Sequence, residues 1–224
     1  MKTNQDYKNA ALAALKGNWA PAVLYVVLLS VVVVAIAGSQ SFFSTSLDPT
    51  DVAVVPILVG LMGGSLIVNI FFSYPLAYIG NYNAFRLLYE NGDDNIISNG
   101  FSLPFKNYLH NVWVCFLMML KIFLWTLLLF IPGIYKALQY SMTPYIAVEH
   151  PELSALETID MSRQMMKGHV WDLFLLGLSF IGWVFLALLT LGIGFFWLVP
   201  YMQTSFAAFY GDLKAEYLVG NTEA

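Results

Sequence analysis

Charge and cysteine are both scarce in this sequence. Only 11% of the 224 residues are charged, against roughly a quarter in a typical soluble domain. A soluble protein of this length could not bury the 59% of residues that are hydrophobic, whereas a lipid bilayer accommodates them. The single cysteine, Cys115, lies within an apolar block, which excludes an intramolecular disulfide and a CxxC metal site. We interpret Cys115 as a buried thiol that behaves as a small apolar side chain.

The sequence also lacks the patterns that reactive or strongly charged sites use. The ten Lys and Arg residues are scattered and form no basic patch with interleaved aromatic residues, so nucleic acid is not an expected partner. None of the three histidines stands in a metal-ligand spacing, and no serine lies in a nucleophile motif. We therefore expect no enzyme activity, with no catalytic residue, metal site or cofactor. Acidic residues are nearly absent from the apolar blocks, which argues against an ion-coupled carrier.

Six apolar blocks occupy most of the chain and predict one all-α, polytopic membrane domain with six transmembrane helices. The expected spans are 21–38, 54–82, 112–130, 134–148, 173–189 and 195–210. The second span is long and contains Pro56 and Pro75, so we expect it to tilt or kink. Ile131-Pro132-Gly133 and the segment 190–194 predict tight breaks after the third and fifth spans. Ala35-Ile36-Ala37 resembles a signal-peptidase site, but we interpret the first span as uncleaved because it is long enough to cross a membrane.

Basic residues outside the apolar blocks predict the orientation. With six spans they all fall on one side, while the opposite side, with the loop over 39–53 and the two glycine-containing breaks, has no Lys or Arg. Positive charge is typical of the cytoplasmic side. We therefore predict a multi-pass protein of the cytoplasmic membrane with both termini in the cytoplasm. The residues on that side are Lys2, Lys8, Lys16, Arg86, Lys106, Arg163, Lys167 and Lys214.

Short motifs recur along the chain and indicate an internal repeat. Lys16-Gly17 and Lys167-Gly168 each end a short amphipathic segment just before a predicted span, where glycine is a natural helix C-cap. Each even-numbered span also has a proline next to a tyrosine, at Tyr74-Pro75, Pro144-Tyr145 and Pro200-Tyr201. We predict three helical hairpins, each preceded by an interfacial amphipathic helix. The alternative is that both motifs recur by composition at membrane interfaces.

Four polar residues are candidates for ligand or lipid contact. Lys121 lies near the middle of the third span, where a charge costs roughly 2.5–3.5 kcal/mol, so it should face the bundle or a cavity, with Asn69 as a candidate polar partner. The alternative is that Lys121 snorkels to a headgroup. Arg163 and Lys167 lie on the helix expected after the capping box at Ser154. They are expected either to meet lipid phosphates or, for Arg163, to pair with Asp160 on a solvated or packed helix.

The C-terminal half resembles a known family. The motifs are SRQMMKG over 162–168, LSFIGW over 178–183, LTLGIG over 189–194, Pro200-Tyr201 and Phe209-Tyr210, with LWTLLLFIPGI upstream over 124–134. Together they resemble the bacterial membrane proteins of domain-of-unknown-function family 975 across about 124–214. This resemblance implies a six-span protein of the bacterial inner membrane and supplies no activity or ligand. The layout is also similar to the membrane domains attached to some glycerophosphodiester phosphodiesterases, without the phosphodiesterase domain itself.

Two functions fit these observations. The first is a non-enzymatic membrane protein that handles or senses lipid, or a partner protein, at the bilayer. The alternative is a small transporter or channel with a polar site near Lys121, because broken spans and repeats are common in transporters.

Overall fold

The computed structural model describes residues 2–45, 60, 63–64, 67–92 and 95–222. Over these ranges the chain is helical and contains no β-strand. It consists of three consecutive units, each with a short helix, a long apolar segment and a return segment. Part of the predicted second span, 54–59, 61–62 and 65–66, lies outside the described residues.

The first two units have the following elements. Unit one contains α1 (Asn4–Leu15), α2 (Trp19–Thr45) and a return through the π-helices η1 (Asn69–Ser73) and η2 (Leu76–Gly80) into α4 (Asn81–Asn91). Unit two contains α5 (Ile96–Ser102), η3 (Leu103–Phe105), α6 (Tyr108–Leu128), α7 (Phe130–Gln139) and α8 (Thr143–Glu149). The return of unit one stays helical past Tyr82, the predicted end of the second span, because no helix-breaking residue occurs before Gly92, which takes the left-handed conformation at φ 62°.

Unit three contains α9 (Ala155–Met165), α10 (Val170–Leu178), α11 (Ile181–Leu189) and α12 (Phe195–Thr222). The predicted break over 190–194 is present between α11 and α12, with Leu191 and Gly192 both at positive φ. Pro200 lies inside α12.

The same kind of turn joins the short helix to the long segment in each unit. Lys16 has φ −63° and ψ 116°, and Gly17 has φ 92°, which are the angles of a type II turn. The Asn18 N–H closes this turn on the Leu15 carbonyl at 2.9 Å. The turn of unit three has Gly168 at φ 94° and the equivalent hydrogen bond from His169 to Met166 at 3.1 Å. In unit two Lys106 has φ −68° and ψ 121°, and Asn107 takes the left-handed conformation at φ 55°.

Three segments among the described residues are long and apolar enough to cross a membrane. They are Trp19–Ile36, Tyr108–Leu128 and Val170–Leu189. Each begins directly after one of the three turns, so each is the outgoing segment of its unit. These segments bear out the expectation of a helical membrane protein, while six spans remain a prediction.

The fourth predicted span, 134–148, is wrong as a single helix, because a turn over 140–142 divides it between α7 and α8. The fifth, 173–189, lies within the candidate membrane segment Val170–Leu189, in which a turn at Ser179 and Phe180 separates α10 from α11. The predicted break at Ile131-Pro132-Gly133 is also misplaced. These residues lie within α7, and the chain reverses at Leu129, which is extended at φ −158°. Proline is tolerated in the first turn of a helix, so Pro132 follows the reversal.

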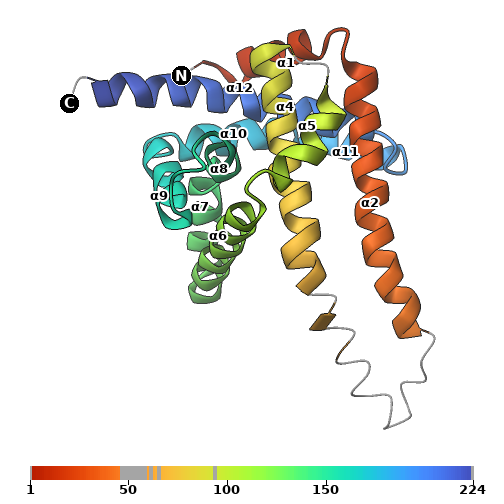
Figure 1. Ribbon diagram of the computed structural model, residues 1–224. Helices are drawn as coiled ribbons and strands as arrows, with labels where there is room; N and C mark the ends of the chain where they lie inside the picture. Colours follow the sequence, from red (N-terminus) through yellow and green to blue (C-terminus); the bar gives the residue numbers. More distant parts are fainter. Residues whose placement is uncertain (1, 46–59, 61–62, 65–66, 93–94, 223–224) are drawn as a thin grey trace.

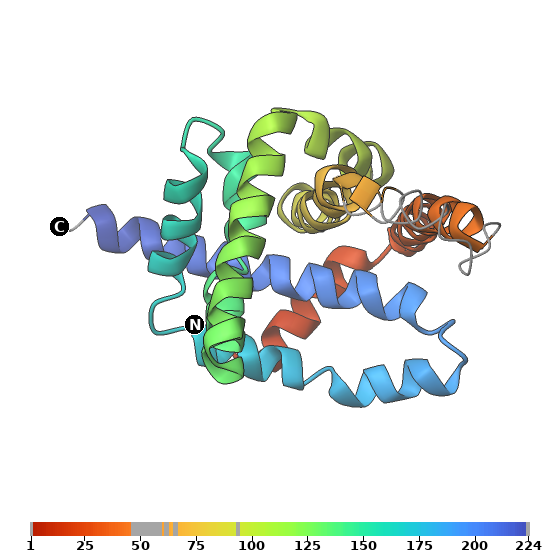
Figure 2. The ribbon, with the colours of Figure 1, turned by 90° about the horizontal axis from the view of Figure 1, so that it is seen from below.

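The three outgoing segments leave a common junction in different directions (Figures 1 and 2). Helix α2 runs down the view of Figure 1, α6 runs down the view of Figure 2, and α10 and α11 run across both. Helix α1 packs against α12, so the first and last helices of the chain contact each other. The main buried cluster lies at the junction and includes side chains from α1, α8, α9, α10 and α12.

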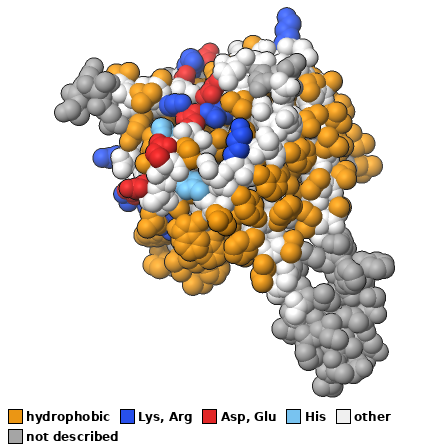
Figure 3. Space-filling view, viewed as in Figure 1, with side chains coloured by type: hydrophobic (Ala, Val, Ile, Leu, Met, Phe, Trp, Pro, Cys, Tyr) orange, Lys and Arg blue, Asp and Glu red, His pale blue; other side chains and the backbone are white. Residues whose placement is uncertain are grey.

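Charged side chains gather on one part of the surface (Figure 3). In that view they lie over α1, α9 and the C-terminal part of α12, while hydrophobic side chains cover the outer parts of α2, α6 and α7. Many large hydrophobic side chains are more than half exposed, including Val34, Leu128, Ile131 and Leu189. An apolar surface of this extent is typical of a face that meets lipid or another protein.

Candidate functional site

A cluster of charged and polar side chains lies where the return segments of the three units meet. Arg86 from α4 and Lys214 from α12 both donate to Oε1 of Glu149, which ends α8, and the Lys214 bond is 2.8 Å long. The Tyr210 hydroxyl of α12 donates to Oε2 of Glu149 at 2.7 Å. Each unit therefore supplies at least one member of this junction cluster, which we define as Arg86, Glu149, Tyr210 and Lys214.

The buried position of Arg86 is fixed by its own helix and by α8. Its Nε donates to the Asn83 side chain at 3.2 Å, and its Nη1 contacts Glu90 at 3.3 Å. Asn83 in turn donates to the carbonyl oxygen of Pro144 at 2.7 Å. Burial acts to raise the pKa of Glu149, but hydrogen bonds from Lys214 and Tyr210 and the Arg86 charge outweigh it, so this pKa lies below its ordinary value.

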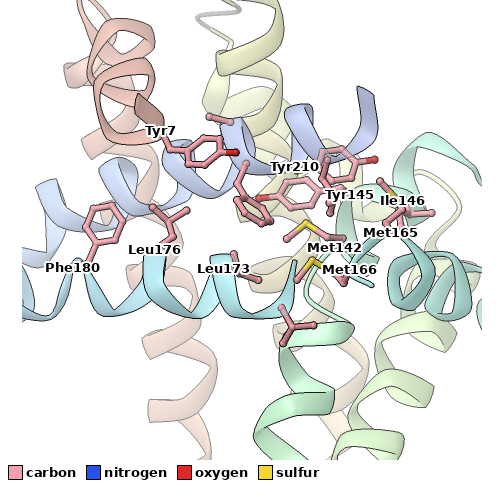
Figure 4. Close-up of a cluster of buried hydrophobic side chains, with 14 of the residues drawn as sticks. Tyr7, Met142, Tyr145, Ile146, Met165, Met166, Leu173, Leu176, Phe180 and Tyr210 are labelled. Carbon is pink, nitrogen blue, oxygen red and sulfur yellow. The ribbon is translucent and has the colours of Figure 1, made fainter. Parts of the chain in front are cut away.

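A column of tyrosines leads from the return segment of unit one to the junction cluster. The rings of Tyr74, Tyr78, Tyr82, Tyr145 and Tyr210 follow one another, with centroid separations of 5.3, 4.7, 5.3 and 4.4 Å. The last two rings lie side by side above Met142 and Met166 (Figure 4). The Tyr145 hydroxyl is buried and has no hydrogen-bond partner among the described residues. The column joins all three units through aromatic contacts.

An apolar pocket of about 350 Å³ lies beside this column. Tyr82 and Phe206 form part of its wall, and the turn between α7 and α8 contributes Ser141 and Met142. Gly177 and Ile181 line it from either side of the break between α10 and α11. Ile181 and the neighbouring lining residue Leu178 are largely exposed, so the pocket opens to the outer surface of the third unit.

Lys8 connects the first helix to the break that borders this pocket. Its Nζ donates to the Ser179 carbonyl oxygen at 2.8 Å and lies 4.4 Å from the centroid of the Phe180 ring. Burial lowers the pKa of Lys8. Ser179 is the C-cap of α10, where carbonyl groups lack partners within the helix, so the Lys8 ammonium supplies a donor at this end of α10.

A second pocket, of about 300 Å³, lies between α1 and the hairpin of α11 and α12. Its lining includes Leu12, Trp19, Trp183 and Trp197. Most of these tryptophan rings remain accessible, with Trp183 and Trp197 each 52% exposed.

The structure does not bring the four predicted site residues together. Lys121 is half-buried on α6, has no hydrogen bond or ion pair within the described ranges, and lines neither pocket. Asn69 begins η1. Arg163 pairs with Asp160 at 2.8 Å, with both side chains nearly half exposed, so the pairing considered from the sequence is present. Lys167 is exposed in the turn that precedes α10.

The buried face of α9 consists of Ala155, Thr158, Ile159, Ser162 and Met165. Leu156 is 53% exposed. Cys115 is buried, as expected. Among the described residues no group of three or more His, Cys, Asp and Glu side chains is arranged to hold a metal ion.

Sequence reasoning missed the junction cluster. The sequence predicts Arg86 only as one of the basic residues on the cytoplasmic side, and Glu149 lies just after the fourth predicted span, 134–148. The sequence does contain a signal for this cluster. Arg86 and Glu149 each follow a tyrosine of a return segment, Tyr82 and Tyr145, by four residues.

These features define an all-helical protein with three segments able to cross a membrane and a charged junction where its return segments meet. The chain belongs to the family described as "Protein of unknown function (DUF975)", whose model matches residues 95–217. The matched region starts at the second unit and ends within α12. No curated protein and no solved structure matches the chain.

Proposed function

We propose that this protein is a non-enzymatic, multi-pass protein of the cytoplasmic membrane that binds the acyl chain of a membrane lipid. The observation that carries the proposal is the apolar pocket of about 350 Å³ at the breaks of two helices. Its volume lies within the range of about 300–1,000 Å³ typical of small-molecule sites. Its lining is almost wholly hydrocarbon and aromatic, with the Ser141 hydroxyl as a polar group.

Two further features favour an acyl chain over a polar ligand. The junction cluster carries charge near the inner end of the tyrosine column, but Glu149 already accepts from Arg86, Tyr210 and Lys214. The pocket opens between exposed apolar side chains at Leu178 and Ile181, which is the environment that a lipid chain occupies. Transport past Lys121, the alternative function, gains no support from either pocket, because Lys121 lines neither.

Photo-crosslinking tests the proposal directly. The full-length protein is reconstituted in vesicles that contain a phospholipid with a diazirine in one acyl chain, illuminated, and digested for mass spectrometry. We expect labelled peptides from 173–184 and from the turn between α7 and α8. Gly177→Leu should lower this labelling several-fold, since a Cβ at Gly177 meets open space and the added side chain can enter the pocket.

Gly182→Leu is the matched control. Gly182 also has open space at its Cβ but does not line the pocket. Equal labelling of the two variants, or labelling spread evenly over the exposed helices, would contradict acyl-chain binding in this pocket. Flux of ions or small solutes in the same vesicles, abolished by Lys121→Met, would favour the transporter instead.

The proposed location has its own test. Reporter fusions after Asn99, Gln164 and Glu223 should report the cytoplasm, and a fusion after Ser44 should report the outside. The Lys and Arg residues outside the apolar blocks all fall on one side of the six predicted spans, which supports this orientation. A cytoplasmic Ser44 would overturn it.

A further inference from the structure

Most basic side chains of this protein have a partner within it. Six of the ten Lys and Arg residues make a hydrogen bond or ion pair. The pairs are Lys2 with Asp212, Lys8 with the Ser179 carbonyl, Arg86 and Lys214 with Glu149, Lys136 with Gln139, and Arg163 with Asp160. Each of these six cationic groups therefore has an oxygen acceptor within the fold.

The remaining basic residues are all lysines, and three of them occupy the same structural position. Lys16, Lys106 and Lys167 each precede the left-handed residue of the turn that joins a short helix to a long segment. All three are exposed, and none of their side-chain ammonium groups has a hydrogen bond or ion pair within the described residues. The fourth, Lys121, lies within α6 and is half-buried.

An aromatic residue follows each of these three exposed lysines within two to four residues. Trp19, Tyr108 and Trp171 lie at or next to the first residue of the three segments that could cross a membrane. Trp171 is 65% exposed. Trp and Tyr are enriched at the membrane–water interface, and lysine beside them lies at the depth of lipid phosphates. Three independent turns thus carry the combination of cation and aromatic ring that marks this boundary.

We infer that Lys16, Lys106 and Lys167 form a set of three equivalent contacts for the phosphates of anionic phospholipids at the cytoplasmic surface of the bilayer. We name them the turn lysines. The first central position of a type II turn has an ordinary negative φ, as Lys16 and Lys106 have at −63° and −68°, so lysine fits there without backbone strain. The inference rests on the membrane location and orientation given in the proposed function, but not on acyl-chain binding, because the three lysines would bind headgroup charge and the pocket a hydrocarbon chain.

Electron spin resonance of labelled lipids tests the inference. The full-length protein is placed in phosphatidylcholine vesicles that contain spin-labelled phosphatidylglycerol or spin-labelled phosphatidylcholine, and the motionally restricted fraction gives a relative association constant. The wild type should prefer phosphatidylglycerol, and the preference should decrease strongly in the triple variant Lys16→Gln, Lys106→Gln, Lys167→Gln. The upper limit for each lysine is about fivefold, corresponding to about 1 kcal/mol near an anionic surface.

A second triple variant controls for net charge. Lys2→Gln, Lys136→Gln and Arg163→Gln together also remove three positive charges, but from side chains that already have partners. This variant should keep most of the preference. An equal loss in both triples, or no loss in the first, would overturn the inference. Gly177→Leu should leave the headgroup preference unchanged, which separates this outcome from a failure of acyl-chain binding.

Discussion

The ammonium of Lys8 lies 2.8 Å from the carbonyl oxygen of Ser179, so the first helix of the chain supports the break between α10 and α11. The contact is buried, since Lys8 is only 8% exposed. It links the N-terminal unit to the wall of the apolar pocket, because Gly177, Leu178 and Ile181 flank the same break.

Lys8→Met should destabilise the protein through this contact. Methionine retains most of the volume but leaves the Ser179 carbonyl without its donor, and an unsatisfied buried acceptor costs about 1–3 kcal/mol. The measurement is thermal unfolding in detergent. Lys2→Met is the control, because Lys2 is 54% exposed in its pair with Asp212 and an exposed pair contributes about 0–1 kcal/mol. Equal shifts in Tm for the two variants would show that Lys8 does not support the break.

Glu149→Gln should have a larger effect. The substitution removes the carboxylate shared by Arg86 and Lys214, and the loss of one member of a buried ion pair costs about 3–5 kcal/mol. The double variant Arg86→Met, Glu149→Met should be more stable than Glu149→Gln alone, since no buried charge then lacks its partner. Glu152→Gln, in an exposed pair with His150, should change Tm little. A double variant less stable than Glu149→Gln would contradict this account.

The stability of the junction should also depend on pH. The folded-state pKa of Glu149 lies below the ordinary value of 4.5. Its contribution is therefore fully present above about pH 4.5 and is lost as the pH falls through the lower folded-state pKa. The difference in Tm between the wild type and Glu149→Gln should be constant near neutral pH and shrink below pH 4.5. A difference that shrinks instead as the pH rises from 5 to 8 would assign the effect to another group.

Gly168→Ala should strain the turn of unit three. Gly168 has φ 94°, and a left-handed conformation costs a residue with a side chain about 1–2 kcal/mol. Gly182→Ala provides the contrast, because a Cβ at Gly182 meets nothing and its helical backbone favours alanine by about 0.5–1 kcal/mol. Unfolding of both variants in the same detergent measures the difference. If Gly168→Ala proves as stable as Gly182→Ala, the turn does not require glycine.

The composition and local motifs of the sequence predicted the helical class and two of the three turns, because these depend on nearby residues. In Lys16-Gly17 and Lys167-Gly168 the glycine indicates the turn. The turn at Lys106 and Asn107 was missed because asparagine in the left-handed conformation gives a weaker local signal than glycine.

The breaks and the junction depend on contacts between distant segments. No proline or glycine occurs at Ser179 and Phe180, and the Lys8 ammonium that bonds to the Ser179 carbonyl comes from 171 residues away in the sequence. Arg86 and Glu149 are 63 residues apart, and each alone resembles an ordinary charge at the end of a membrane segment. Only the packing of three return segments brings them together.

Lys121→Met should preserve the fold or raise its stability. The lysine is half-buried on α6 with no hydrogen bond or ion pair in the described part of the chain, so methionine removes a desolvation cost and keeps much of the volume. Lys214→Met is the matched control, since its loss leaves Glu149 with one fewer cation and should lower Tm. A decrease in Tm for Lys121→Met as large as that for Lys214→Met would mean that the Lys121 ammonium has a structural role in the membrane. Unchanged stability together with unchanged lipid labelling would leave Lys121 outside the proposed function, with snorkelling to a headgroup as its remaining interpretation.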